Sequence, residues 1–186
     1  MRITLTVDGG NSNSRVIVNP TGHTNPDYAT VTFGTGDVIY VGNNGHYCGY
    51  LEYNATNNSF SGNIDDTDLS TADYLHFYFM GNKGEKSQPS SVSITDQTAE
   101  YPVISYAHSN EMYGSTDSYT AKLQNYCAIV KFTTTDLPQA TAITIKGMMN
   151  TVTVNFNPNN GDSFPYSFSQ AGEGEITLHA ESNTER

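Results

Sequence analysis

The sequence predicts an all-β protein built as an antiparallel β-sandwich. Its 186 residues contain about a dozen short segments that are rich in β-branched and aromatic residues. Clusters of Gly, Asn, Asp, Ser and Pro separate these segments roughly every 8–12 residues, a spacing typical of sandwiches. The sequence shows no helical or heptad period and no linker or repeat that divides it, so we expect one domain over residues 1–186.

The first predicted strand is residues 3–7, where apolar and polar residues alternate. Ile3, Leu5 and Val7 share one face, a pattern that predicts a half-buried strand. Residues 8–14 are rich in Gly, Asn and Ser and predict a flexible turn after it.

A hairpin is the next predicted feature. Residues 43–45 are Asn-Asn-Gly, which accept the positive φ angles of a tight hairpin turn. We therefore expect residues 38–41 and 46–53 to pair. Residues 54–58 predict a second turn.

Residues 74–80 predict a strong strand. Leu75, Phe77 and Phe79 form one face, and the intervening residues, His76 among them, form the other. A histidine beside tyrosines in a strand is more often hydrogen-bonded within the sheet than bound to a metal, so we favour a structural role for this one.

Several shorter strands complete the prediction. Residues 109–118 predict a Gly/Ser/Asn loop, and residues 142–146 are expected to pair with residues 151–156 across the turn at 147–150. The other short strands are predicted at residues 15–18, 30–33, 59–62, 92–94, 102–106, 164–168 and 175–178.

Residues 126–132 are the most continuously apolar run of the chain. A run this short, bounded by polar residues, predicts a strand covered on both faces, and we expect it at the centre of the sandwich. The two cysteines, Cys48 and Cys127, both lie in predicted strands, either as buried free thiols or as a disulfide between neighbouring strands.

The composition excludes several classes of function. Asp and Glu total 19 against 8 Lys and Arg, a formal net charge of −11, so the chain lacks the basic surface that nucleic acids need. No apolar stretch is long enough to span a bilayer. No signal peptide is visible, because Met1 leads directly into a strand; if the protein is exported, we expect its targeting segment to lie outside this sequence.

Patterns of known catalytic sites are missing from the sequence, including the Gly-x-Ser-x-Gly, Walker and His-Glu-x-x-His motifs. Residues 34–37 carry two glycines but precede a strand, so they predict a bent strand entry and not a phosphate site. His108 and Glu111 could form an acid–base pair, but both lie in a predicted loop without a nucleophile. We therefore expect no enzyme, no cofactor and no catalytic residue.

Acidic residues gather in one segment, which contains Asp65, Asp66, Asp68 and Asp73. Calcium prefers several oxygens from one loop, but the glycine and the distal glutamate of an EF-hand are missing here. The segment therefore predicts a solvated acidic loop, and we assign no metal residue.

Three tyrosines, Tyr47, Tyr50 and Tyr53, crowd one predicted strand. Strict alternation places Tyr47 and Tyr53 on one face with Leu51, and Tyr50 on the other face with Cys48. Exposed tyrosines stack on sugars or contact proteins, and buried ones cover the edge of a sandwich. The first reading indicates a surface carbohydrate-binding module, with or without calcium, as an alternative function.

The order of the segments resembles the fimbrillin family of Bacteroidales surface proteins, the subunits of a donor-strand pilus. The resemblance spans roughly residues 15–178, and the order and spacing of short pieces carry it. These pieces are residues 33–41, 49–53, 60–62, 74–79, 123–132 and 142–147.

The resemblance implies a location and a topology. Family members are typically exported lipoproteins with two transthyretin-like sandwich domains of Greek-key type, and this chain looks like the first. A second β domain is then expected beyond residue 186, and the lipidated cysteine lies outside this sequence, because Cys48 and Cys127 are internal. The protein would be extracellular, at the outer-membrane surface or in a fimbria, with other pilus subunits, surface receptors or a glycan as partners.

The resemblance also implies an assembly mechanism. Stalk subunits of the family are cut by a trypsin-like protease after an Arg or Lys that follows the first strand, and Arg15 fits that position. Removal of residues 1–15, with Ile3, Leu5 and Val7 as the strand-exchange residues, would open a groove that a donor strand fills. The alternative is that Arg15 is an ordinary surface residue at the start of a strand.

Overall fold

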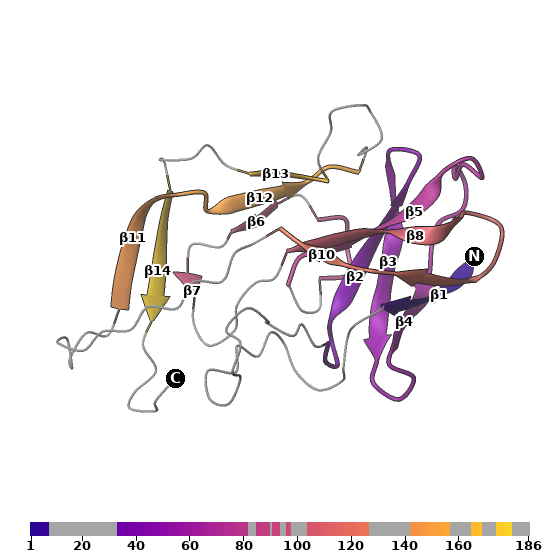
Figure 1. Ribbon diagram of the computed structural model, residues 1–186, viewed down its shortest axis with the longest axis horizontal. Coiled ribbons are helices and arrows are strands. Elements are labelled where there is room, and N and C mark those ends of the chain that lie inside the picture. Colours follow the sequence, from indigo (N-terminus) through magenta and orange to yellow (C-terminus); the bar gives the residue numbers. More distant parts are fainter. Residues whose placement is uncertain are drawn as a thin grey trace.

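The computed structural model describes residues 1–7, 33–81, 85–89, 91–93, 96–97, 104–126, 142–156, 165–168 and 174–179. Every regular element in these ranges is a β-strand, which confirms the all-β prediction (Figure 1). The described ranges also contain no helix of the length and apolarity that a membrane crossing requires.

An eight-stranded sheet forms the largest part of the structure, on the right of Figure 1. In spatial order its strands are β10 (Gln124–Asn125), β8 (Ser105–Met112), β5 (Tyr74–Phe79), β2 (Val38–Asn43), β3 (His46–Asn54), β4 (Ser59–Asn63), β1 (Arg2–Val7) and β9 (Ser118–Ala121). Neighbours are antiparallel except β1 and β9, which are parallel. Because β9 and β10 follow one another in the chain but stand at opposite ends of this order, the sheet curves until it nearly closes on itself.

The hairpin predicted between β2 and β3 is confirmed. Asn44 and Gly45 have φ angles of 52° and 78°, which a tight two-residue turn of this kind requires. The pairing register then shifts by one residue after Val41, opposite Gly49. Such a bulge reverses the alternation of side chains on either side of it.

The bulge corrects the predicted faces of β3. Cys48 faces the interior together with Leu51 and Tyr53, whereas Tyr47 faces outward together with Tyr50. Strict alternation had grouped Tyr47 with Tyr53, and this was wrong because the bulge adds one residue between them.

An interior core fills the concave side of the large sheet. The predicted division of β5 is confirmed, since Leu75, Phe77 and Phe79 lie in this core and Tyr78 faces the other way. The buried members of the interior core are Ile3, Leu5, Phe33, Ile39, Val41, Cys48, Leu51, Tyr53, Phe60, Ile64, Leu75, Phe77, Phe79, Ala107, Tyr119 and Ala121.

Two three-stranded sheets form the rest of the described structure, on the left of Figure 1. One contains β11 (Ala142–Met148), β14 (Gly174–His179) and β7 (Asp96–Gln97), and the other β13 (Tyr166–Phe168), β12 (Thr151–Val154) and β6 (Ser91–Ser93). They pack on the outer face of the large sheet through a second core, the outer cluster. Its buried members are Val38, Tyr40, Tyr78, Met80, Ile104, Val152, Phe156, Tyr166 and Ile176.

Two predictions about strands are wrong. Residues 109–112 belong to β8 and not to a loop, because the polar Ser109 is buried and satisfied inside the sheet, where its hydroxyl accepts the Leu75 N–H at 3.0 Å. β11 and β12 do not pair with each other but join different small sheets. Gly147, with a φ of 79°, lies at the bulge where the chain passes between the two sheets.

Some predictions lie outside the described residues. These are the strands at 15–18 and 30–32, the central strand apart from Tyr126, and the residues Arg15 and Cys127. Cys48 is a buried free thiol, and burial raises its pKa to about 12.

Candidate functional site

β1 lies in a slot between β4 and β9, which we call the β1 slot. It runs antiparallel to β4, where Ile3 stands opposite Gly62 and Leu5 opposite Phe60. It runs parallel to β9, where Leu5 stands opposite Tyr119. Both edges of β1 are therefore paired, and its removal would leave two unpaired strand edges facing one slot.

Two side chains anchor β1 in the slot. Ile3 is 1% exposed and Leu5 is fully buried, while Val7 is partly buried against the same interior core. The prediction that these three residues share a half-buried face is confirmed. Burial of one such aliphatic side chain contributes about 1.5–3 kcal/mol to stability.

The N-terminal half of β1 is further held by backbone hydrogen bonds. The N–H of Thr4 donates to the carbonyl of Asp117 at 2.8 Å, and the N–H of Ile64 donates to the carbonyl of Met1 at 2.8 Å. Both partners lie at the ends of the neighbouring strands, so these bonds fix the register of β1 in the slot.

The two neighbours of β1 are both distant from it in the sequence. β4 begins at Ser59 and β9 at Ser118, so neither neighbour is joined to β1 by a hairpin. β4 is held independently by β3, and β9 follows β8 directly in the chain.

Gly62 lies where β4 packs closely against β3. A Cβ atom at this position would lie 2.7 Å from the carbonyl oxygen of Tyr50, closer than atoms pack. Glycine therefore allows β4 to approach β3 next to the place where Ile3 pairs.

The three tyrosines of β3 do not form one exposed surface. Tyr53 is 7% exposed in the interior core, where its hydroxyl donates to Asn58 Oδ1 at 2.7 Å. Tyr47 and Tyr50 are half-buried against the outer cluster, and the ring of Tyr47 meets that of Phe156 edge-on at a centroid distance of 5.4 Å.

His76 is a buried, hydrogen-bonded sheet histidine, as predicted. Its Nδ1 lies 2.6 Å from the hydroxyl of Tyr106, and its Nε2 lies 3.3 Å from Asp73 Oδ1. Burial lowers the pKa of His76, and the Asp73 carboxylate opposes this only in part. The ring connects β5 with β8 and with the turn that precedes β5.

The acidic segment is a solvated loop, as predicted, since Asp65, Asp66 and Asp68 are exposed. Burial acts to raise the pKa of Asp73, but the N–H groups of Asn44 and Tyr74, each 2.8 Å away, lower it overall. Nowhere in the described ranges do three or more His, Cys, Asp or Glu side chains gather in a way that could hold a metal ion.

His108 and Glu111 lie on β8, and the predicted loop around them is therefore wrong. His108 Nδ1 is 2.8 Å from the carbonyl of Ser109, whereas the Glu111 carboxylate accepts the hydroxyl of Ser115 at 3.0 Å. The two side chains thus bond to different partners and form no acid–base pair.

Sequence reasoning missed β9 as the second neighbour of β1. The signal was present, because Tyr119, Ala121 and Leu123 alternate with polar residues in the way a half-buried strand does. The parallel pairing of β9 with a strand so far away in the chain carries no local sequence signal at all.

Comparison with known proteins identifies no relative: no family model, no curated protein and no solved structure matches this chain. Arg15 lies outside the described residues, and its cleavage stays a prediction. The β1 slot is the feature of the fold from which a function can be argued.

Proposed function

We propose that the protein is a non-catalytic structural subunit of a cell-surface fimbria, or a fimbrillin-like adhesin, that assembles by exchange of a β-strand. The position of β1 is the single observation that supports this function most. β1 is paired on both edges and anchored by Ile3 and Leu5, yet no hairpin joins it to either neighbour.

Release of β1 would expose the unpaired edges of β4 and β9 together with the apolar contacts of its two anchors. An incoming strand restores both kinds of interaction: its backbone completes the hydrogen bonds of the two edges, and its alternate side chains enter the interior core. The donor is therefore an extended segment with apolar residues at every second position, as in residues 3–7 of this chain.

The proposal includes the finer features that the fimbrillin resemblance implies. The chain is then the N-terminal, transthyretin-like Greek-key sandwich of a subunit exposed at the outer-membrane surface, and Arg15 is the processing site. The curved sheet packed against smaller sheets is compatible with this architecture.

Limited digestion with trypsin tests the proposal. We expect the first cut after Arg15, and we expect a labelled peptide of residues 1–7 in excess to replace the severed strand in the cut protein. An Arg15→Gln variant serves as the control and should resist both cleavage and exchange.

Mass spectrometry of the early digest decides the outcome. The proposal is contradicted if residues 1–15 stay attached while the chain is cut first after Lys83 or Lys86. It is also contradicted if the cut protein takes up no peptide under conditions where it stays folded.

A further inference from the structure

β8 and β9 follow one another as a hairpin whose two strands separate midway. At one end β8 is paired with β10, with Tyr106 opposite Gln124. At the other end the N–H of Thr120 donates to the side-chain Oδ1 of Asn110 at 3.0 Å instead of to a backbone carbonyl. We call the space between residues 106–110 and 120–124 the hairpin opening.

β8 and β9 run alongside each other at the hairpin opening without pairing as a ladder. The carbonyl of Ile104 accepts the N–H of Tyr126 at 2.8 Å, so every second residue of β8 turns its peptide groups to this side. The same register brings His108 opposite Lys122, but no backbone pair joins β8 and β9 in the described part of the chain.

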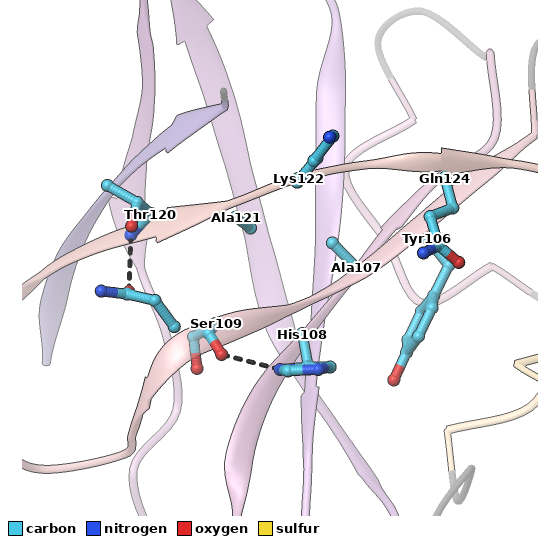
Figure 2. A pocket seen from close by; sticks show the side chains of 9 residues that line it. Tyr106, Ala107, His108, Ser109, Thr120, Ala121, Lys122 and Gln124 are labelled. Carbon is cyan, nitrogen blue, oxygen red and sulfur yellow. Dashed lines mark hydrogen bonds between the residues drawn. The ribbon is translucent and has the colours of Figure 1, made fainter. Parts of the chain in front are cut away.

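A pocket of about 430 Å³, open to solvent on one side, lies along the hairpin opening (Figure 2). Sites for small molecules in proteins span roughly 300–1,000 Å³, so this one suits a compact ligand. In Figure 2, Ala107 and Ala121 lie between the two strands, and Gln124 extends toward Tyr106. The lining residues are Tyr106, Ala107, His108, Ser109, Asn110, Thr120, Ala121, Lys122 and Gln124.

The lining offers the chemistry that recognises a sugar ring. The amides of Asn110 and Gln124 and the hydroxyl of Thr120 both donate and accept hydrogen bonds, as a polyol requires. The ring of Tyr106 packs into the outer cluster, where it stacks on the ring of His76 at a centroid distance of 5.9 Å, so recognition of a ligand depends on the polar side chains.

Lys122 adds a positive charge to this lining. The other two described lysines are engaged, Lys86 with Glu52 at 2.8 Å and Lys146 with Glu175 at 2.9 Å. Lys122 forms no ion pair with a carboxylate of the described residues, in a chain whose net charge is −11. A carboxylate on the ligand would supply the missing partner through a charge-assisted hydrogen bond.

We propose that the hairpin opening binds an acidic sugar, a pyranose that carries a carboxylate, with Lys122 contacting the carboxylate and Asn110, Thr120 and Gln124 contacting the hydroxyl groups. This site is separate from the β1 slot, which lies along the other edge of β9. It also differs from the tyrosines of β3. Sugar binding at the hairpin opening can therefore be tested separately from strand exchange.

Titration of the ¹⁵N-labelled, uncut protein with glucuronate, followed by NMR, tests the site. We expect saturable binding, with the shifted amide signals confined to residues 106–110 and 120–124. Glucose, which has the same ring without the carboxylate, should bind at least about tenfold more weakly, as expected for loss of one charge-assisted contact. If the methyl glycoside binds as tightly as free glucuronate, the ligand is the end of a glycan. If the methyl glycoside does not bind, the ligand is a free sugar acid.

Lys122→Gln is the decisive variant, since the side chain of Lys122 is exposed and its replacement leaves the core unchanged. This substitution should lower the affinity for glucuronate about tenfold. Lys146→Gln removes the same charge from β11 and should leave the affinity unchanged. The proposal is overturned if glucuronate gives no saturable binding, if glucose binds equally well, if the two lysine variants weaken binding equally, or if the shifts map to Tyr47 and Tyr50.

Discussion

At the scale of single residues, Leu5 is the centre of the β1 slot. It is fully buried and pairs with Phe60 on one side and Tyr119 on the other. We expect Leu5→Ala to lower the free energy of unfolding by about 2–5 kcal/mol, because a cavity replaces the side chain between two strands. Urea denaturation of the uncut protein measures this change.

Thr6 provides the matched control for Leu5, since it is the next residue on the same strand but exposed. Thr6→Ala should change the free energy of unfolding by no more than about 0.5 kcal/mol. Equal effects of the two substitutions would show that Leu5 does not anchor β1.

His76 determines how stability responds to mild acid. Burial holds the pKa of His76 below its ordinary value of 6.5, so the unfolded chain takes up a proton at a pH where the folded chain does not. The free energy of unfolding is therefore highest above about pH 6.5 and falls as the pH drops from there toward 5. Urea denaturation at a series of pH values should show a shallower dependence in His76→Gln than in the unmodified protein.

His46 gives the control for this measurement, because it is exposed at the start of β3. His46→Gln should keep the pH dependence of the unmodified protein between pH 5 and 7. If His76→Gln keeps it as well, the buried ring is not the group that titrates on unfolding.

At the scale of elements, a tyrosine of one small sheet bonds to the large sheet. The hydroxyl of Tyr166 on β13 is buried and donates to the carbonyl of Ser105 on β8 at 2.6 Å. Tyr166→Phe keeps the ring and leaves that carbonyl without this donor, so we expect a loss of about 1–3 kcal/mol. Thermal unfolding followed by circular dichroism measures it, and an unchanged melting temperature would show that the contact adds no stability.

The strands differ in how far local sequence determines them. The β2–β3 turn is fixed by Asn44 and Gly45, and the faces of β5 by simple alternation, so both could be predicted. The bulge opposite Gly49 could not, because alternation says nothing about where a residue is inserted. The partners of β11 and β12 were also missed, since a short turn predicts pairing unless tertiary packing separates the two strands.

At the scale of the whole molecule, strand exchange predicts that a peptide can restore a cut protein. After cleavage at Arg15 and removal of the first strand, a peptide of residues 1–7 should raise the melting temperature again, because it refills the slot. The same peptide with Leu5→Asp should not, since it would bury an unpaired charge beside Phe60. Equal rescue by both peptides would contradict specific refilling of the slot.

The sequence by itself determined that the chain is all-β, that residues 3–7 form a strand with one buried face, and that residues 38–53 form a hairpin. These features depend on side-chain alternation and on turn residues, which are local. Only the tertiary structure decided that β1 lies between β4 and β9, that Tyr47 and Tyr53 face opposite ways, and that β8 and β9 separate around a pocket. Each of these depends on contacts between residues far apart in the chain, for which a single sequence carries no direct signal.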